Sequence, residues 1–276
     1  MEEASTAAGA RILGAHIEGP FLSPARKGAH DPDNLRPIDL GLLKEILAPG
    51  WVRVMTVAPE LPNSEQATEL LRQSGTVASV GHTDATYEET LRALDVGFTK
   101  ATHLYNAMSP FEHRAPGAVG ALLTDGRVRA GIIADGVHTH EGALRLAYRE
   151  KGPGGLALVT DSMEAAGMPE GEYELSGRTV HLKNGAVRLP DGTLAGSVLT
   201  MDGAVRNAVR FLGTSLENAV RMATQTPAEI LGLESKGKIV SGAEADLVIL
   251  SPESFVEETI VAGETVYRRE GEDRAR

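Results

Sequence analysis

The chain has 276 residues, of which 42% are hydrophobic, so it is long enough for one large domain with a sizeable core, with or without a small appendage. Its formal net charge of -11 disfavours a nucleic-acid partner, and the absence of cysteine excludes disulfides and thiolate metal sites. No apolar run reaches membrane-spanning length and the first ten residues lack a signal-peptide pattern, so we expect a cytoplasmic protein with no membrane partner.

Up to about residue 161, short apolar runs alternate with helical patterns. The runs that predict strands lie at residues 11–19, 51–60, 76–82, 98–105, 128–136 and 156–161. Helices are expected at residues 64–74, 85–97 and 141–152; Thr86 is a suitable N-cap for the second, with Glu89 three residues on and Gly97 as a stop. This alternation predicts parallel strands joined by right-handed crossovers.

The pattern changes after residue 172. Residues 173–197 alternate apolar and polar side chains and carry the turn signals Asn184–Gly185 and Asp191–Gly192, which predict antiparallel hairpins. Two helices are expected next, at residues 201–213 and 215–232, where Gly213 and Gly232 are natural stops. The tail from residue 237 is rich in strand-forming residues and predicts a small β appendage.

The predicted strands of the first region end on polar residues that carry a carboxylate or an imidazole. In parallel α/β proteins the carboxyl ends of strands build the active site. A lone Asp before a helix is more often an N-cap, and Asp135–Gly136 alone would be an ordinary turn. A whole series is harder to explain in that way, because strand ends have no general need for imidazole. The series is Glu18, Glu60, His82, His103, Asp135 with His138 just beyond it, and Asp161.

Without cysteine, Glu18, His82 and His103 are the plausible ligands of a divalent metal. Three protein ligands leave a position for water, which is the pattern of a catalytic zinc site. A metal there would lower the pKa of water from about 16 to roughly 7, and a further carboxylate must then take the proton. By position alone, Asp161 and Asp135 are both candidates for that carboxylate.

Basic residues form a second group. Arg26, Lys27 and His30 follow the first strand and His113–Arg114 follow His103, so they predict either a phosphate pocket or solvated loop charge. Pro110 and Pro116 would stiffen the loop that carries His113–Arg114. Residues 193–197 offer backbone N–H groups to an anion, or form a plain turn into a helix.

Several motifs carry a family resemblance. The chain contains HIEGPF followed by KGAH, then VGHTDATYEE, ATHLYNAMSPFEHRAPG, GIIADGVHTH, LVTDSMEAAGM, GTLAGSVLTM and the tail GKIVSGAEADLVIL. Together, from about residue 14 to residue 266, these resemble the N-acetylglucosamine-6-phosphate deacetylases, a family of the amidohydrolase superfamily. HIEGP and HLYNAM are specific to that family, whereas the tail alone would be a weak signal.

The resemblance implies a role for each matching residue. Glu18, His82 and His103 match the ligands of one divalent metal per subunit, usually Zn²⁺, with Fe²⁺, Mn²⁺ or Co²⁺ as alternatives. Asp161 matches the catalytic acid/base, which decides between it and Asp135. The positions that match substrate-binding residues are Ala29, Asn106, Ala107, Arg114, His138, Leu194, Ala195 and Gly196. Part of the phosphate site is supplied across a homodimer in this family.

The implied reaction is hydrolysis of the N-acetyl group of N-acetylglucosamine 6-phosphate, in amino-sugar catabolism. Asp161 would act as the base for attack of water on the amide carbonyl, and the metal and His138 would stabilise the oxyanion. The protonated Asp161 would then protonate the leaving amine, and the products would be glucosamine 6-phosphate and acetate.

The implied fold is a (β/α)8 TIM-type barrel, which needs eight strands, whereas the sequence predicts six. No His-x-His pair follows an apolar strand ahead of Glu18. We therefore expect a partial barrel over residues 1–235 that lacks about two N-terminal strands, and part of a small β-sandwich domain over residues 236–276. Such a fragment would expose a strand edge and apolar helix faces, so we expect it to fold poorly or to be inactive.

Two kinds of alternative stay open. The first is an N-acetylgalactosamine-6-phosphate deacetylase or another amidohydrolase, such as a cyclic-amide hydrolase with a carboxylated lysine between two metals. Lys100 does not fit that lysine, because it lies inside a predicted strand, three residues before His103. The second is an inactive truncated fragment that binds metal or sugar phosphate, although the intact Glu18, His82, His103 and Asp161 argue against long decay.

Overall fold

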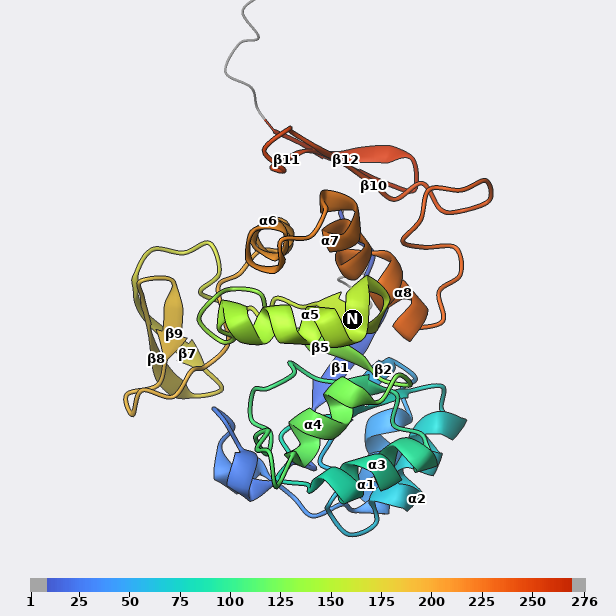
Figure 1. Cartoon of the computed structure of the whole chain (residues 1–276), viewed down its shortest axis with the longest axis vertical. Coiled ribbons are helices and arrows are strands. Elements are labelled where there is room, and N and C mark those ends of the chain that lie inside the picture. The colour runs from blue at the N-terminus through green and yellow to red at the C-terminus, as the bar shows by residue number, and fades with distance from the viewer. Residues whose placement is uncertain (1–8, 270–276) are drawn as a thin grey trace, which may run out of the picture.

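The computed structural model describes residues 9–269, and its centre is a six-stranded parallel sheet (Figure 1). Its strands follow one another in the sheet in the same order as in the chain, so each crossover leads to the neighbouring strand. The alternation of strands and helices therefore predicted the sheet correctly. The strands are β1 (Ala15–Glu18), β2 (Val52–Val57), β3 (Val77–Val80), β4 (Lys100–Ala101), β5 (Arg129–Ile132) and β6 (Leu156–Leu158).

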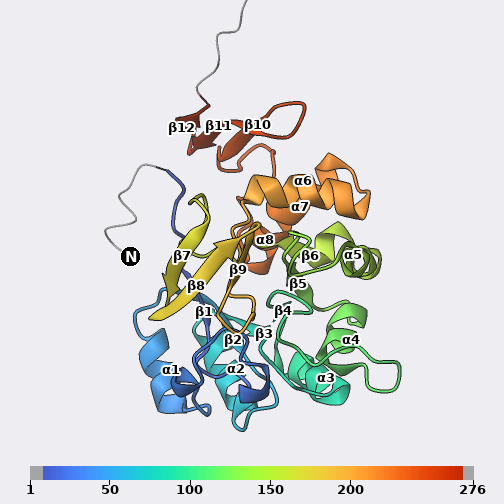
Figure 2. The same cartoon turned by 90° about the vertical axis from the view of Figure 1, so that its left-hand side faces the viewer.

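Helices cover the outer side of this curled sheet (Figures 1 and 2). The helix expected at residues 85–97 has the predicted capping box between Thr86 and Glu89, and it ends at Gly97, whose φ is 119°. The helix expected at residues 141–152 leaves the helical conformation at Gly152, as its sequence predicts. The helices are α1 (Leu40–Leu47), α2 (Ser64–Gln73), α3 (Tyr87–Val96), α4 (Gly117–Thr124), α5 (Glu141–Gly155), α6 (Met201–Leu212), α7 (Leu216–Ala223) and α8 (Gln225–Ile230), with short 3₁₀ segments at Pro24–Arg26 and Pro32–Asn34.

Two helices, α1 and α4, were not expected from the sequence, and one expected helix is broken. The single helix expected over residues 215–232 is divided into α7 and α8 at Thr224, whose φ and ψ are -128° and -78°. Pro227 explains the break, because proline has no N–H to continue the helical ladder and its ring crowds the preceding turn.

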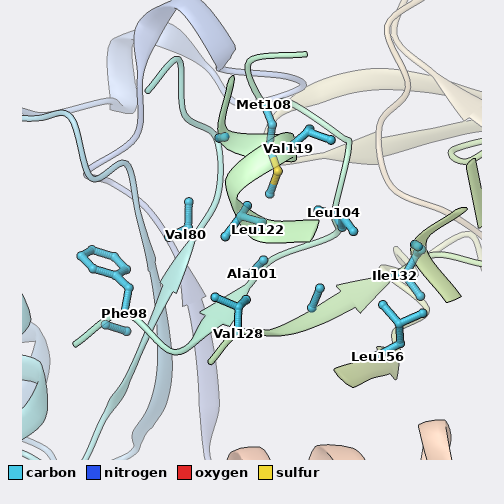
Figure 3. Packing of buried hydrophobic residues seen from close by; sticks show 14 of the residues in the cluster. Val80, Phe98, Ala101, Leu104, Met108, Val119, Leu122, Val128, Ile132 and Leu156 are labelled. Atoms are coloured by element: carbon cyan, nitrogen blue, oxygen red, sulfur yellow. The ribbon is translucent and has the colours of Figure 1, made fainter. Parts of the chain in front are cut away.

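The main core lies between the sheet and its helices (Figure 3). At its centre Leu122 of helix α4 faces Val80 and Ala101 of the sheet, and Val119 of the same helix lies beside Met108. Seven consecutive residues of α4, from 117 to 123, are buried. The carboxyl ends of the strands are therefore held on a close-packed base.

A second, smaller core belongs to a three-stranded antiparallel sheet, β7 (Gly171–Leu175), β8 (Arg178–Lys183) and β9 (Ala186–Arg188). The Asn184–Gly185 turn was predicted correctly: both residues have positive φ, at 52° and 71°, as a tight hairpin requires. Ala29, from the loop after β1, packs against this second core. The hairpin sheet is thus attached to the loop that follows the first strand.

The C-terminal residues form a third sheet, β10 (Leu247–Leu250), β11 (Val256–Val261) and β12 (Glu264–Arg268), as the strand-rich tail predicts. Figure 1 places it at the end of the molecule away from α1, α2 and α3, beyond α6 and α7. Lys236 and Arg11 both form ion pairs with Glu244 and Asp246 at its base. Within residues 9–269, no helix is long and apolar enough to cross a membrane.

Candidate functional site

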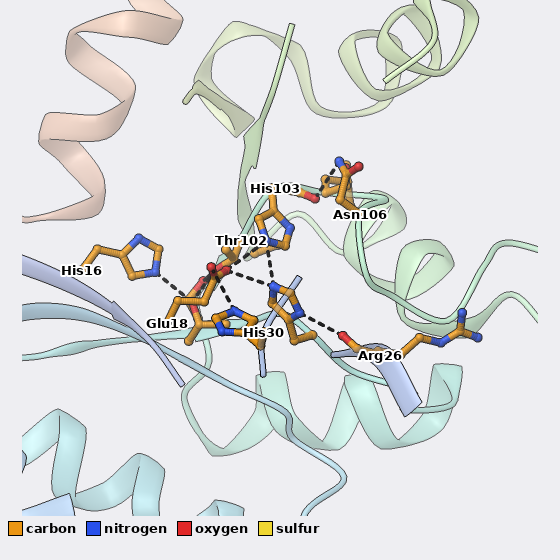
Figure 4. A network of polar contacts seen from close by, with 12 residues as sticks. His16, Glu18, Arg26, His30, Thr102, His103 and Asn106 are labelled. Carbon is orange, nitrogen blue, oxygen red and sulfur yellow. Dashed lines mark hydrogen bonds and ion pairs between the residues drawn. The ribbon is translucent and has the colours of Figure 1, made fainter. Parts of the chain in front are cut away.

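Glu18, His82 and His103 come together at the carboxyl edge of the parallel sheet. The His103 Nε2 atom lies 2.9 Å from Glu18 Oε1, and His82 Nε2 lies 3.3 Å from the same oxygen. One potential ligand atom from each residue lies within 4.8 Å of the other two. Figure 4 shows Glu18 and His103 pointing toward one another from separate strands. The polar strand ends noted in the sequence therefore converge as the parallel arrangement requires.

The backbone at these positions is unusual. His82 and His103 have φ values of 48° and 26°, and Asp161, just beyond β6, has a φ of 50°. Non-glycine residues rarely adopt the left-handed region, and each such residue costs on the order of 1–3 kcal/mol unless its surroundings compensate. The chain accepts this cost at three of the polar positions on one rim, which is typical of a functional site rather than of ordinary turns.

A backbone carbonyl holds the ring of His82. His82 Nδ1 lies 2.8 Å from the carbonyl oxygen of Arg26. Since a carbonyl can only accept, Nδ1 carries the proton, and Nε2 is the ring nitrogen left to face Glu18 and His103. This arrangement is the one that a metal-binding imidazole needs.

The charges in the cluster also favour a cation at its centre. Burial raises the pKa of the Glu18 carboxyl, but hydrogen bonds from His103, His30 and His82 outweigh this and hold the pKa below its usual range. Burial lowers the pKa of His103, but its hydrogen bond to Glu18 together with the negative charges of Glu18 and Asp161 outweighs this, so the net pKa is raised. Glu18 therefore stays a carboxylate, and the site stabilises positive charge beside it.

Two further observations fit a bound divalent metal. The Nε2 atoms of His82 and His103 lie only 3.2 Å apart, so two unprotonated nitrogens would repel unless a cation lay between them and Glu18. His103 presents the same Nε2 atom to Glu18 Oε1, so both imidazoles and the carboxylate face one point. Two imidazoles and one carboxylate form a donor set that suits Zn²⁺ and its neighbours in the first transition series.

Asp135 and His138 form a tight pair just after β5. Asp135 Oδ2 lies 2.6 Å from His138 Nδ1, while its other oxygen accepts from the backbone N–H groups of Val137 and His138. Burial raises the pKa of Asp135, but the hydrogen bonds from the His138 ring and from the Val137 and His138 N–H groups together outweigh this, so the net pKa is lowered. Asp135 is thus engaged in orienting His138, whereas Asp161 is exposed to solvent on the rim. Glu60 is also engaged structurally, because it accepts from Thr83 Oγ1 and the Asp84 N–H.

One cleft of about 820 Å³ is lined by Glu18, His82, His103, His138 and Asp161. Its walls come from the strand ends, the loop after β1 and the hairpin sheet β7–β9. Two residues expected at the site do not line it: Ala195 is fully buried in the second core, and Arg114 is exposed at the tip of a turn closed by Glu112 and Ala115. The expected site residues that do line it are Glu18, Ala29, His82, His103, Asn106, Ala107, His138, Asp161, Leu194 and Gly196.

The cleft also has walls that the sequence did not reveal as part of a site. His30 Nε2 lies 3.5 Å from Glu18 Oε2, and its ring meets that of His82 edge to face at 4.7 Å. The sequence placed His30 in a basic group that predicted either a phosphate pocket or solvated loop charge, and Arg26 and His30 of that group both line the cleft. Ser176 and Arg178 reach the cleft from the β7–β8 hairpin, and no motif marks them. Only the folding of the hairpin over the strand ends brings them there.

Lys100 does not take part in the cluster. It is buried, and its ammonium contacts Ser79 Oγ at 3.5 Å and the Ala101 carbonyl at 3.4 Å. Burial lowers its pKa to about 8. The hydrogen bonds of its ammonium thus go to Ser79 and Ala101 rather than to Glu18, His82 or His103.

Comparison with known proteins agrees with this geometry. Residues 1–266 match the model of the amidohydrolase family. The N-acetylglucosamine-6-phosphate deacetylase of Lysinibacillus sphaericus is 44% identical over 92% of this chain, and the N-acetylgalactosamine-6-phosphate deacetylase of Escherichia coli O157:H7 is 38% identical over 93%. The chain spans about two thirds of the length of these curated relatives, at 66% and 68%.

A solved structure also resembles this chain closely. The Mycobacterium smegmatis N-acetyl-D-glucosamine-6-phosphate deacetylase, in a mutant form in complex with N-acetyl-D-glucosamine-6-phosphate, superposes with a TM-score of 0.88. It is 42% identical, and the match covers 92% of this chain and 68% of that one. The chain therefore belongs to the amidohydrolase family, in the group of the N-acetylglucosamine-6-phosphate deacetylases.

Proposed function

We propose that the chain hydrolyses the N-acetyl group of N-acetylglucosamine 6-phosphate, giving glucosamine 6-phosphate and acetate. One observation carries this proposal: the grouped Glu18, His82 and His103 share one cleft with Asp161 and His138. The cleft thus holds a metal-binding group, a free carboxylate and an imidazole, which are the parts that amide hydrolysis needs. The relatives that carry this activity in their names support the choice of substrate.

Glu18, His82 and His103 would hold one divalent cation, with Zn²⁺ favoured and Fe²⁺, Mn²⁺ or Co²⁺ as alternatives. When bound, the cation supplies Lewis-acid chemistry, lowering the pKa of water and polarising the amide carbonyl. The remaining steps belong to the chain's own residues.

Asp161 would take the proton from the attacking water as the new C–O bond forms. His138, held at Nδ1 by Asp135, would present its other ring nitrogen to the acetyl oxygen and stabilise the negative charge that develops there. The C–N bond would then break as Asp161 returns the proton to the leaving amine. Asn106, Ala107 and the backbone of Ala29 and residues 194–196 would hold the sugar.

The second candidate function is deacetylation of N-acetylgalactosamine 6-phosphate, because a relative named for that activity is 38% identical. The two substrates differ in the configuration of one hydroxyl group. Turnover of both sugar phosphates, measured side by side at equal concentration, separates the candidates.

The complete fold, the oligomeric state, the location and the metal are proposed as well. The six parallel strands would belong to a (β/α)8 barrel, and residues 236–269 to a small sandwich domain. The exposed position of Arg114 suits a contribution to the cleft of a second copy in a homodimer. A cytoplasmic location and the identity of the metal likewise stay predictions.

The proposed function is tested by acetate release from N-acetylglucosamine 6-phosphate, with and without a chelator. We expect release that stops on chelation, returns when Zn²⁺ is added, and falls by several orders of magnitude in Asp161→Asn. Bound metal without any release from either sugar phosphate would instead favour a binding module.

A further inference from the structure

We propose that Ser197 is a positioning residue for Asp161: it holds the backbone on both sides of that residue and so fixes the direction of its carboxylate. This inference rests on the proposed function, in which Asp161 carries the proton. It assigns a role to a serine that is 2% exposed and does not line the cleft.

Asp161 depends on its neighbours for its conformation. It lines the cleft with a φ of 50°, in the left-handed region that a side chain other than glycine rarely adopts. Within residues 9–269, its carboxylate forms no hydrogen bond or ion pair with another protein group. The direction of the carboxylate is therefore set by the backbone that carries it.

Ser197 contacts both peptide groups that flank Asp161. Its hydroxyl donates to the carbonyl oxygen of Thr160, which belongs to the peptide group before Asp161. Its backbone N–H donates across 2.7 Å to the carbonyl oxygen of Asp161, which belongs to the peptide group after it. Each peptide group is planar, so the angle between the two groups is given by φ and ψ of Asp161. One residue thus restrains both angles.

The remaining polar groups of Ser197 are also occupied. Its hydroxyl oxygen accepts from the Leu199 N–H across 3.0 Å, and its carbonyl accepts from the Met163 N–H across 3.0 Å. The hydroxyl therefore uses both its proton and a lone pair. Its removal would leave the Thr160 carbonyl and the Leu199 N–H without this partner.

The chain before Ser197 lies close to the same backbone. Gly196 has a φ of 75°, and a Cβ atom there would lie 3.2 Å from the carbonyl oxygen of Asp161. Of the two roles that the sequence left open for residues 193–197, anion binding does not suit the Ser197 N–H, because this donor is already bonded to Asp161. The segment instead supports the residue that would carry the proton.

The test compares two buried serines with the same bonding pattern. Ser197→Ala removes the hydroxyl and keeps the backbone groups. Ser109→Ala is the control, since Ser109 Oγ donates to the Ala85 carbonyl across 2.5 Å and accepts from the Ala118 N–H across 2.7 Å. Ser109 is also buried and does not line the cleft. Each change is made alone and together with Asp161→Asn, and kcat and KM for N-acetylglucosamine 6-phosphate are measured with Zn²⁺ present.

For Ser197→Ala we expect kcat to fall about 10- to 100-fold while KM changes less than about 2-fold, because a misplaced carboxylate affects the transition state more than binding. In the Asp161→Asn background the same change should lower kcat less than about 2-fold, since no carboxylate is left to misplace. Ser109→Ala should lower the melting temperature as Ser197→Ala does and leave kcat unchanged. Equal losses of kcat in both backgrounds, or in both serine variants, would overturn the inference.

Ser197→Cys keeps the comparison available if Ser197→Ala does not fold. The thiol has a similar size and is a weaker donor, so the cavity is avoided while the bond to Thr160 is weakened. We expect kcat of Ser197→Cys to lie between those of the wild type and Ser197→Ala, again with KM nearly unchanged. A wild-type kcat in a folded Ser197→Cys together with a wild-type kcat in Ser197→Ala would contradict the role.

Amide hydrogen exchange separates this inference from the catalytic proposal, because it needs no turnover. The Met163 N–H, which donates to the Ser197 carbonyl, should exchange about 10-fold faster in Ser197→Ala than in the wild type or Ser109→Ala. If the wild type releases no acetate and this difference appears, the proposed function fails and the hold of Ser197 on the Asp161 segment stands. Unchanged exchange in Ser197→Ala would contradict the inference, whatever the activity.

Discussion

The Nδ1 atom of His82 donates to the carbonyl oxygen of Arg26 across 2.8 Å, which ties a metal-site imidazole to the loop after β1. That loop also carries Ala29 and His30, which face the same cleft. Its conformation therefore sets two things at once, the tautomer of His82 and the position of the cleft wall. Outer-shell hydrogen bonds of this kind commonly change metal affinity by about 10- to 100-fold.

Gly28 makes the approach of this loop to His82 feasible. Its φ is 56°, and a Cβ atom there would lie 3.0 Å from His82 Cε1, which is too close without a shift. We expect Gly28→Ala to lower metal affinity about 10-fold or more, because either the loop or the ring must move. Zinc competition with a chromophoric chelator measures this affinity.

Gly50→Ala is the matched control for that variant. Gly50 also has a positive φ, at 74°, but a Cβ atom there meets nothing within 4 Å. Both variants should lose about 1 kcal/mol of unfolding free energy from the backbone conformation, and only Gly28→Ala should lose metal. Equal metal affinity in the two variants would show that the loop does not set the geometry of His82.

Asp135 is expected to act through His138. Asp135→Asn keeps an oxygen for the Val137 and His138 N–H groups but removes the charge beside the His138 ring. We expect kcat and kcat/KM for the sugar phosphate to fall together, by roughly 10- to 100-fold, because the lost interaction matters most in the transition state. Steady-state kinetics with N-acetylglucosamine 6-phosphate checks this.

Asp125→Asn controls for the local turn. Asp125 also accepts from a backbone N–H two residues on, that of Arg127, but it lies outside the cleft. It should leave kcat unchanged. If Asp135→Asn altered only thermal stability, the pair with His138 would be structural.

The C-terminal sheet should loosen in acid. Hydrogen bonds from Lys236 lower the pKa of Glu244 and of Asp246 to about 2 each. Carboxyl groups with lowered pKa stabilise the fold above their unfolded values, near 4, and this stabilisation is lost as the pH falls toward 2. Thermal melts of the wild type and Lys236→Met should therefore differ at pH 6 and converge near pH 2.

Salt provides the control for that comparison. The cluster is partly exposed to solvent, so high salt at pH 6 should also reduce the difference between the two proteins. A difference in melting temperature that persists at pH 2 would mean that Lys236 acts through packing of its alkyl chain.

The parallel sheet and the metal cluster were accessible from the sequence because both follow local rules. Strand–helix alternation predicts strand order, and parallel strands place their carboxyl ends on one rim, so Glu18, His82 and His103 had to converge. The family motifs favoured Asp161 over Asp135, and the hydrogen bond that Asp135 accepts from His138 is consistent with that prediction.

Other features depend on tertiary packing and have no local signal. Helix α4 is buried almost all round, so it lacks the one-sided apolar pattern by which helices are found. Arg178 becomes a cleft residue only when the hairpin sheet folds over the loop that carries Ala29. Arg114, although it lies in a site motif, is exposed and does not line the cleft of its own chain.

The most direct test of the central claim is the zinc content of three proteins after chelation and reloading: the wild type, Glu18→Gln and Glu174→Gln. Glu174 is the matched control, since its carboxylate also lines the cleft but lies outside the ligand group. The account predicts one zinc per chain in the wild type and in Glu174→Gln, and at least a 100-fold weaker affinity, on the order expected for a lost ligand, in Glu18→Gln. Unchanged zinc binding by Glu18→Gln would contradict it.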